Sequence, residues 1–394
     1  MDTKRVCFIS RGTPHKGLES FLRREYLLYE YFDKVFKRPI FLDVSKVFTS
    51  KVLSAGELTS SAHALLPQNF EIIVPKDLKE FRRFLRTGDL IAVSNFSEEW
   101  YDWYIHYYLK KYLVPLIYIH TMSEIIDFQY QKGENKGIAQ IWARSKRVCF
   151  KIIDHLLEYI FCAKVDTLFI SNKRLAGQIK NSRRFKEVVI TNSRFYDSYL
   201  AHSYPVTEDY IVFLDSMLPY HLDQVNFGHR LIDRELYYFN LDRVLNTVEQ
   251  KLGKKAVVCL HPKYDEKNLE KDFGRRQTVK HRTQEFTARA AVVLFHESSA
   301  INNAVLYNKK VVQLAGSGFN EFIRTNCESV RKALGVEALD MYEATEQQVD
   351  HLLGALKVNT QRYTAFLSDY IVSPGKEGVA SCRQIADHIK LKYM

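Results

Sequence analysis

The sequence predicts an α/β protein of two domains, each built on a parallel β-sheet covered by helices. Three observations lead to this fold class. Short runs of β-branched and aromatic residues recur along the chain, and stretches with helical periodicity separate them. Strands that alternate with helices form parallel sheets with helices on both faces. The length of 394 residues also exceeds what one hydrophobic core usually organises.

The elements follow in order. Strands are expected in the first half at Val6–Ser10, Phe70–Val74, Leu90–Ser94, Pro115–His120 and Thr167–Ser171. Helices are expected between them at Leu18–Phe36, Leu78–Leu85, Glu98–Tyr112 and within Gly137–Cys162. The second half repeats the alternation, with strands at Tyr210–Leu214, Ala256–Leu260, Ala291–Phe295 and Val311–Leu314 and a last helix at Val379–Lys392.

The best domain boundary is the polar, proline-containing segment Ser203–Asp209, which separates an expected helix from the next strand. We therefore expect an N-terminal domain over residues 1–205 and a C-terminal domain over residues 206–394. The last helix would close the C-terminal domain.

Composition limits the partners. The net charge of +11 favours an anionic partner: a phosphosugar, a nucleic acid or an acidic membrane face. Nucleic acid is not expected, because no zinc-finger, RNA-recognition or helix-turn-helix pattern accompanies the charge. No signal-peptide pattern and no apolar run of roughly 20 residues occurs, so a cytoplasmic protein with its six cysteines reduced is expected.

A basic amphipathic helix offers one route to a membrane. The basic run Ala143–Arg147 precedes apolar residues at helical spacing from Phe150 to Ile160. Such a helix can lie on the inner face of the cytoplasmic membrane. It can equally be a buried helix of the first domain, and the sequence leaves both interpretations open.

The first chemical motif follows the expected strand at Ala256–Leu260. His261, Pro262 and Lys263 emerge at the carboxyl edge of a parallel sheet, where open α/β sheets bind their ligands. Pro262 fixes the backbone after the histidine and ends the strand. An imidazole there can donate a hydrogen bond to a phosphate oxygen and stabilise a leaving group. By itself the His-Pro pair is equally consistent with a structural role.

The second motif follows the expected strand at Ala291–Phe295. Ser298 and Ser299 stand at the start of a helix, where serines are ordinary N-cap residues. The same hydroxyls, together with free amides and the helix dipole, also make an anion site. Because both motifs follow strands of one sheet, they point to one edge, and together they favour a phosphate-containing ligand.

These motifs carry a family resemblance. His261-Pro262 after one strand, and Ser298-Ser299 before a helix and the strand Lys309–Leu314, resemble bacterial transferases that use CMP-activated ulosonic acids. These are the sialyl-, Kdo- and pseudaminic/legionaminic-type enzymes of the glycosyltransferase-B fold, and the resemblance covers mainly residues 210–315. It implies two Rossmann-like domains with a cleft between them. The C-terminal domain would bind the CMP-sugar donor. The N-terminal domain would bind a glycan acceptor, free or lipid-linked, in lipopolysaccharide or capsule synthesis.

The resemblance also assigns residues. It implies that His261, Ser298 and Ser299 contact the CMP phosphate, with Pro262 and Lys263 beside them, and that an acidic residue holds the ribose. Glu285 is the best match for the acidic residue, although acidic residues are common in the first turn of any helix.

Asp215 determines the expected mechanism. It ends the first strand of the C-terminal domain and resembles the nucleophile of the retaining β-ulosonic-acid transferases, which attacks the anomeric carbon. His221 would orient it or touch the sugar carboxylate. Several alternatives stay open: Asp215 as a cap of the following turn, an inverting sialyltransferase-like enzyme of the same fold, a sugar-nucleotide epimerase or hydrolase, and a non-catalytic nucleotide- or glycan-binding protein.

Two further expectations concern metal and acceptor. No Asp-X-Asp sequence occurs, so neither a divalent metal nor another cofactor is expected. Arg11 and Lys16, in the loop after the first strand, and His120, at the end of a later strand, are candidates for binding the acceptor or the sugar carboxylate. All three would equally fit ordinary solvated connections.

Overall fold

The protein's structure, a computed structural model, describes residues 4–10, 22, 25–44, 47, 65–94, 100–121, 164–180, 184–221, 223–226 and 229–394. These residues group into two compact units. The first contains the described residues before 122, those from 164 to 198, and Val372–Met394. The second contains Tyr199–Ile371.

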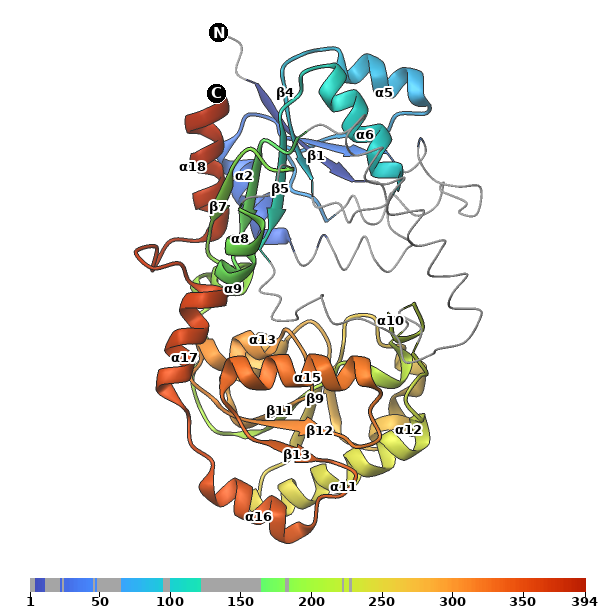
Figure 1. Cartoon of the computed structure of the whole chain (residues 1–394), viewed down its shortest axis with the longest axis vertical. Coiled ribbons are helices and arrows are strands. Elements are labelled where there is room, and N and C mark those ends of the chain that lie inside the picture. The colour runs from blue at the N-terminus through green and yellow to red at the C-terminus, as the bar shows by residue number, and fades with distance from the viewer. Residues whose placement is uncertain are drawn as a thin grey trace. The chain divides into compact units, whose positions relative to one another are not determined.

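Each unit is built on one parallel sheet (Figure 1). The first sheet has seven strands in the order β3-β2-β1-β4-β5-β6-β7, and the second has six in the order β10-β9-β8-β11-β12-β13. In both, the chain begins near the centre, adds two strands on one side, and then crosses back to add the others. The prediction of two Rossmann-like α/β domains is confirmed.

The elements of the first unit have the following bounds. Its strands are β1 (Arg5–Ser10), β2 (Ile40–Asp43), β3 (Glu71–Ile73), β4 (Leu90–Ser94), β5 (Leu116–His120), β6 (Thr167–Ile170) and β7 (Val188–Ile190). Its helices are α2 (Tyr26–Val35), α5 (Leu78–Leu85), α6 (Trp100–Lys111), α8 (Lys173–Ile179) and α18 (Ser381–Tyr393), while α9 (Arg194–Ala201) leads into the second unit. None of the described helices is both long and apolar enough to cross a membrane.

The elements of the second unit have the following bounds. Its strands are β8 (Tyr210–Leu214), β9 (Ala256–Cys259), β10 (Gln277–Val279), β11 (Ala290–Phe295), β12 (Lys310–Ala315) and β13 (Ala338–Asp340). Its α-helices are α10 (Asp223–Asn226), α11 (Arg234–Leu252), α12 (Leu269–Phe273), α13 (Thr283–Ala288), α14 (Ile301–Leu306), α15 (Glu321–Leu334), α16 (Glu346–Ala355) and α17 (Thr360–Phe366). Its shorter helical turns are η2 (Leu218–Tyr220), η3 (Glu266–Asn268) and η4 (Leu367–Ile371).

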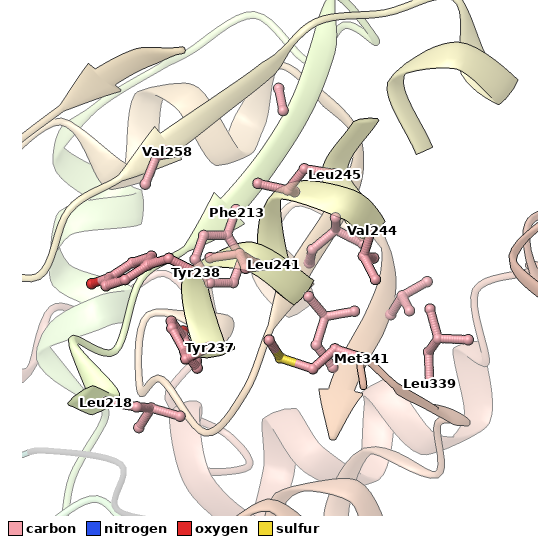
Figure 2. Close-up of a cluster of buried hydrophobic side chains, with 14 of the residues drawn as sticks. Phe213, Leu218, Tyr237, Tyr238, Leu241, Val244, Leu245, Val258, Leu339 and Met341 are labelled. Atoms are coloured by element: carbon pink, nitrogen blue, oxygen red, sulfur yellow. The ribbon is translucent and has the colours of Figure 1, made fainter. Parts of the chain in front are cut away.

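The central strands are apolar throughout because both faces of each sheet are covered. In the first unit, α2 and α18 pack on one face, where Phe8 contacts the cluster that contains Phe32 and Ile385. Helices α5 and α6 pack with the alternate residues, including Cys7 and Ile9. The side chains of β8 alternate between the two faces in the same way, and its Phe213 packs with residues of α11 (Figure 2).

The sequence missed four strands, β2, β7, β10 and β13, each only three or four residues long. Runs this short carry too few residues to show a clear periodicity. The expected helix over Leu18–Phe36 is described only as α2 and a few isolated residues. The expected helix within Gly137–Cys162 lies outside the described residues.

The C-terminal helix differs from the expected domain division. It was expected to close the C-terminal domain over residues 206–394, but Val372–Met394 belongs to the first unit. Asn192 holds the returning segment: its side chain accepts a hydrogen bond from the Ser373 amide at 2.7 Å and donates to the carbonyls of Lys376 and Val379, each at 2.8 Å. The periodicity of α18 could not reveal this partner, which lies about 180 residues earlier.

Asp197, on α9, caps the start of α18. Its carboxylate accepts hydrogen bonds from the Ser381 amide and hydroxyl, both at 2.5 Å, and from the Cys382 amide at 3.2 Å. The N-cap residue of α18 is Ala380, which has no oxygen in its side chain to do so. The first unit therefore supplies the cap that the helix lacks.

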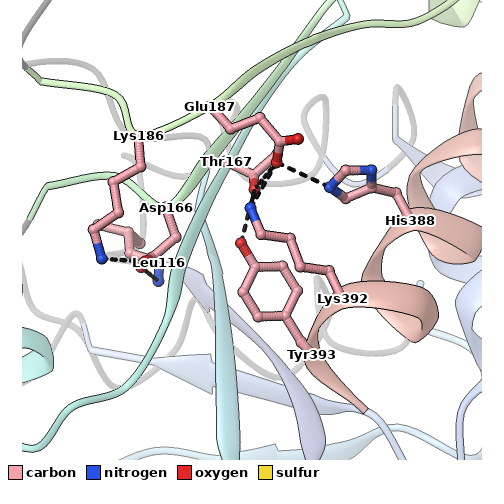
Figure 3. A network of polar contacts seen from close by, with 8 residues as sticks. All are labelled: Leu116, Asp166, Thr167, Lys186, Glu187, His388, Lys392 and Tyr393. Atoms are coloured by element: carbon pink, nitrogen blue, oxygen red, sulfur yellow. Dashed lines mark hydrogen bonds and ion pairs between the residues drawn. The ribbon is translucent and has the colours of Figure 1, made fainter.

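The other end of α18 is held by a polar network (Figure 3). One oxygen of Glu187 accepts hydrogen bonds from Lys392 at 2.6 Å, Thr167 at 3.0 Å and His388 at 3.1 Å. Tyr393 shares a hydrogen bond of 2.7 Å with the Thr167 hydroxyl. These contacts fix the end of α18 beside the amino ends of β6 and β7.

Replacing Asp197 with Ala should destabilise the first unit by about 2 kcal/mol, because three hydrogen bonds to the start of α18 are lost together. Urea unfolding followed by circular dichroism measures this loss. Asp387→Ala is the matched control. Asp387 lies on the exposed face of the same helix, and its carboxylate is 3.6 Å from Arg383, which is too far for a hydrogen bond. Equal unfolding free energies for the Asp197 variant and the wild type would contradict the role of the cap.

Candidate functional site

The candidate site lies at the carboxyl end of β8, in the centre of the second sheet. The chain adds strands on one side of β8 and then crosses to β11 on the other. Ligands of open α/β sheets bind where the strand order reverses in this way. Leu214 pairs with Cys259 of β9 and with Phe295 of β11. The residues that follow these three strands therefore lie side by side.

Asp215 follows β8 and joins two of these strand ends. Its side chain is only 3% exposed. One carboxylate oxygen accepts a hydrogen bond from the Met217 amide at 2.8 Å, and the other accepts one from the His261 amide at 3.3 Å. Burial raises the pKa of the carboxyl to about 6, although both hydrogen bonds lower it. The geometry matches the turn-capping role that the sequence left open.

Ser216 is a site residue that the sequence did not single out. Its hydroxyl is buried, and no hydrogen-bond partner for it is found in the part of the chain that the structure describes. A buried hydroxyl without a partner is costly unless a ligand or water completes it. The next residue, Met217, has a φ of 53°, a left-handed conformation that is unfavourable for its side chain. An orphaned donor beside a strained turn indicates a ligand position.

His261 is half-buried at the end of β9. Its Nδ1 accepts a hydrogen bond from the Lys263 amide at 3.2 Å, so the neutral ring carries its proton on Nε2. Burial, together with His221, Lys263 and Lys280, lowers its pKa to about 4. The His221 ring lies 6.2 Å away, centroid to centroid. His261 is thus a neutral hydrogen-bond donor in positively charged surroundings at physiological pH.

Asp272 supports the two segments that carry these histidines. Its Oδ2 accepts hydrogen bonds from the hydroxyls of Tyr220 at 2.7 Å and Tyr264 at 2.5 Å, and its Oδ1 accepts two from Arg234. Tyr220 directly precedes His221, and Tyr264 lies three residues after His261. Burial and the Asp272 carboxylate raise the pKa of both tyrosines, so the hydroxyls stay protonated donors. One buried carboxylate therefore sets the spacing of both histidine segments.

The turn after β8 has a second support, at Gln224. Its side chain donates to the Leu218 carbonyl at 2.5 Å and accepts a hydrogen bond from Asn320 at 2.5 Å. Asn320 is also the N-cap of α15, where it accepts the Ile323 amide. The start of α15 and the turn after β8 are thus linked through buried amides.

Ser298 and Ser299 follow β11 as the sequence predicted. Ser298 is half-buried and accepts a hydrogen bond from the Ala300 amide at 3.3 Å, while Ser299 is exposed. The register of β11 with β8 brings this segment next to Ser216. A ligand over the end of β8 would lie within reach of the hydroxyls of both segments.

His296, in the same segment, is a core residue. It is fully buried, with Nδ1 at 2.6 Å from the Leu314 carbonyl and Nε2 at 2.8 Å from the Tyr237 hydroxyl. Nδ1 must therefore carry the proton, and Nε2 accepts from the tyrosine. Burial lowers the pKa of this histidine to about 4. It stabilises the end of β11 and is not exposed to a ligand.

The other predicted donor-site residues lie in different surroundings. Pro262 and Lys263 are exposed beyond the end of β9. Glu285, on α13, accepts two hydrogen bonds from Arg282 at 2.8 and 2.7 Å, and these hydrogen bonds lower its pKa. The structure thus brings Glu285 to Arg282, and the charge of Arg289, at the amino end of β11, also acts on it.

Of the predicted acceptor residues, His120 belongs to the first unit. His120 is the last residue of β5 and is half-buried. Its carbonyl accepts a hydrogen bond from the Ser171 amide at 3.3 Å, as neighbouring parallel strands require. Arg11 and Lys16 lie outside the described residues.

The sequence identified the strand ends but not the buried groups that shape them. The sequence did not indicate Asp272, Tyr220 or Gln224, because each acts through a partner distant in the sequence. It did not indicate Ser216 either, whose hydroxyl has no partner among the described residues. Only the adjacency of Ser216 to Asp215 could have drawn attention to it. Among the described residues, no three His, Cys, Asp or Glu side chains lie close enough together to hold a metal ion.

The sequence matches no protein-family model and no curated protein. Solved structures do match it. The wall teichoic acid polymerase TagF has a TM-score of 0.52 and 11% identity, over 98% of this chain and 89% of that chain. S. aureus MnaA in complex with UDP has a TM-score of 0.51 and 13% identity, over 99% of this chain and 96% of that chain. The glycotransferase of kitacinnamycin has a TM-score of 0.51 and 12% identity, over 99% of both chains.

At these identities the likeness establishes the fold and nothing finer. Three different proteins share two Rossmann-like domains with this chain over almost its whole length. The chain therefore has the glycosyltransferase-B fold that the resemblance implied. The fold does not determine the ligand, which depends on the residues at the strand ends.

The buried His296 leads us to predict that the free energy of unfolding depends on pH. An exposed histidine in the unfolded chain has a pKa near 6.5, so the unfolded state binds the proton more tightly than His296 does. Between that value and the pKa of about 4 in the folded protein, stability should fall as pH falls, by on the order of 3 kcal/mol.

Urea unfolding at a series of pH values tests this. His296→Asn should be less stable than the wild type at neutral pH, and its stability should fall less steeply below pH 6.5. Identical pH slopes for the two proteins would show that His296 is not the group that titrates.

Proposed function

We propose that the chain is a glycosyltransferase that binds a nucleotide-activated sugar at the carboxyl end of β8. The observation that carries the proposal is the grouping of uncharged donors there: the orphaned Ser216 hydroxyl and the protonated Nε2 of His261. The Ser298 segment adjoins them through the register of β8 and β11. Several neutral donors around one position suit phosphate oxygens.

The surroundings of His261 favour an anionic ligand. Burial lowers the pKa of His261 most, and His221, Lys263 and Lys280 lower it further. The same positive field attracts a phosphate, and the neutral imidazole still offers its Nε2 proton. As the bond to the sugar breaks, negative charge grows on the phosphate, and the hydrogen bond from His261 strengthens with it. His261 therefore serves both binding and leaving-group stabilisation.

We propose a CMP-activated ulosonic acid, Kdo or a sialic, pseudaminic or legionaminic type of sugar, as the donor. The support is the His-Pro and Ser-Ser resemblance together with the absence of an Asp-X-Asp sequence. As the bond from the anomeric carbon to the phosphate oxygen breaks, the electron pair goes to the departing CMP and the sugar becomes cation-like, so stabilising the phosphate can supply much of the catalysis without a metal. A glycan, free or lipid-linked, would be the acceptor, bound by the first unit.

Asp215 has two proposed roles, and the geometry favours one. As a nucleophile it must present an oxygen to the anomeric carbon, yet its side chain is 3% exposed and both oxygens accept backbone hydrogen bonds. As a positioning residue it holds the His261 backbone and the turn that bears Ser216. We favour the positioning role, and the covalent retaining mechanism is the alternative that experiment separates from it.

Ser216→Ala should weaken CMP binding by about 10- to 100-fold, because one hydrogen bond to a charged phosphate is lost. Its stability should not change, since the hydroxyl has no partner among the described residues. Thr287→Val is the matched control, because the Thr287 hydroxyl is also buried without such a partner but lies on α13. Isothermal titration calorimetry with CMP and with UDP measures both the loss and the choice of nucleotide.

The same titrations can contradict the proposal. Equal CMP affinity for the wild type and Ser216→Ala would show that CMP does not bind at the end of β8. Tighter binding of UDP than of CMP would leave the site in place and overturn the CMP donor. Loss of transfer on addition of a chelator would overturn metal independence.

Intact-mass measurement with a CMP-sugar alone separates the two roles of Asp215. The positioning role predicts no adduct on the wild type. Asp215→Asn should then bind CMP more weakly. The side-chain NH2 group introduced by the substitution would face the backbone N–H of Met217 or of His261, and two donors cannot bond to each other. A mass increase equal to the sugar residue in the wild type, absent in Asp215→Asn, would instead establish the covalent mechanism.

The alternatives predict different products. An epimerase or hydrolase would consume the nucleotide-sugar without an acceptor, and a non-catalytic binding protein would bind CMP without turnover. NMR of the product distinguishes retention from inversion, which the fold alone does not determine.

A further inference from the structure

The amino edge of the first sheet, remote from the strand ends used by most ligands of this fold class, has an unusual surface. The two most exposed large apolar side chains of the described residues are Leu391, 89% exposed, and Leu113, 88% exposed. Leu113 lies in the short connection between α6 and β5. Leu391 lies in the last turn of α18, which is fixed beside β6 and β7 by Lys392 and Tyr393 (Figure 3). Both leucines therefore belong to this edge and are exposed there.

Basic side chains surround the two leucines. Each lies in the last turn of a helix, after a helix or before a strand of this sheet, and so belongs to the same edge. Those that are exposed are Lys37, Arg38, Arg86, Lys110, Lys111, Lys164, Lys186, Lys390 and Lys392. Lys390 extends over the ring of Phe36, with its Nζ 5.7 Å from the ring centre, which connects the end of α18 to the segment before β2.

Three of the acidic groups at this edge form ion pairs within the protein, and a fourth, Asp89 just before β4, is exposed. Glu71 binds Arg5 at 2.6 Å. Asp166 binds Lys186 at 2.6 Å and also the Leu116 amide, and Glu187 binds Lys392 (Figure 3). The remaining basic residues outnumber the remaining acidic ones, so the edge presents a positive surface with apolar points.

Helices α5 and α6 extend this surface with aromatic rings. Arg82 lies 5.5 Å from the ring centre of Tyr108, and Arg86 lies 5.7 Å from that of Tyr112. The two tyrosine rings stack at 6.3 Å with an angle of 13° between their planes. Tyrosines and arginines in such rows are typical of the boundary between lipid headgroups and acyl chains.

We propose that the amino edge of the first sheet binds the surface of a bilayer that contains anionic lipid. The lysines and arginines would contact the headgroups, and Leu113 and Leu391 would enter the acyl boundary. A nucleic acid would use the same positive charge, but it gives no reason for two almost fully exposed leucines. The expected basic helix near residue 150 lies outside the described residues. The proposal does not depend on the donor or the reaction.

Vesicle sedimentation of the full chain tests the proposal. The wild type should bind vesicles of phosphatidylglycerol and phosphatidylcholine, and bind phosphatidylcholine alone far more weakly. Lys110→Glu with Lys111→Glu should lower binding by more than about 20-fold, since each lost positive charge costs about fivefold. Lys332→Glu with Lys357→Glu is the control, because these exposed lysines belong to the second unit.

Two uncharged variants separate the apolar contribution from charge. Leu113→Asn keeps the left-handed conformation of this position, whose φ is 53°, because asparagine tolerates it. Leu391→Gln keeps a good helix former in α18. Both should weaken vesicle binding about equally at low and high salt, with unchanged thermal unfolding.

Three results would overturn the proposal. The first is no binding to anionic vesicles. The second is equal binding by the wild type and the Lys110/Lys111 variant. The third is displacement from vesicles by RNA together with full binding by Leu113→Asn and Leu391→Gln, which would identify a nucleic-acid surface. Association of the free chain into dimers that Leu391→Gln abolishes, with no vesicle binding, would assign the edge to a second copy.

Discussion

The candidate site depends on one buried carboxylate that joins two strand ends. Asp215 accepts the amides of Met217 and His261, and so ties the turn after β8 to the segment after β9. A parallel sheet sets the spacing of its strands but leaves the residues beyond them unconstrained. Because the backbone of His261 is bound to Asp215, the imidazole and the Ser216 hydroxyl are held as one unit. Preorganised donors of this kind need little rearrangement when a ligand arrives.

Buried aspartates do similar work elsewhere in the chain. Asp272 gathers Tyr220, Tyr264 and Arg234 beneath the two histidine segments. Asp197 receives the start of α18 and returns the end of the chain to the first unit. Each carboxylate is desolvated, and each is compensated by hydrogen bonds from at least two partners. Removing one would release a segment of chain as well as a single contact.

The sequence predicted the fold well because strands buried on both faces produce unmistakable apolar runs, as at Ile211–Leu214 and Ala290–Phe295. It also singled out His261 and Ser298 as candidates, because each follows such a run within a few residues. It did not find Asp272 or Gln224, whose partners lie on other elements and leave no periodic signal. The return of α18 was missed for the same reason: nothing local to Val379–Lys392 indicates that Asn192 and Asp197 receive it.

The proposed site places a nucleotide phosphate above the end of β8. The most direct measurement is an experimental structure of the protein crystallised with CMP. We predict phosphate oxygens within hydrogen-bond distance of His261 Nε2 and the Ser216 hydroxyl. The Asp215 carboxylate should still accept the amides of Met217 and His261. A phosphate bound away from the end of β8, with the Ser216 hydroxyl completed by water alone, would contradict it.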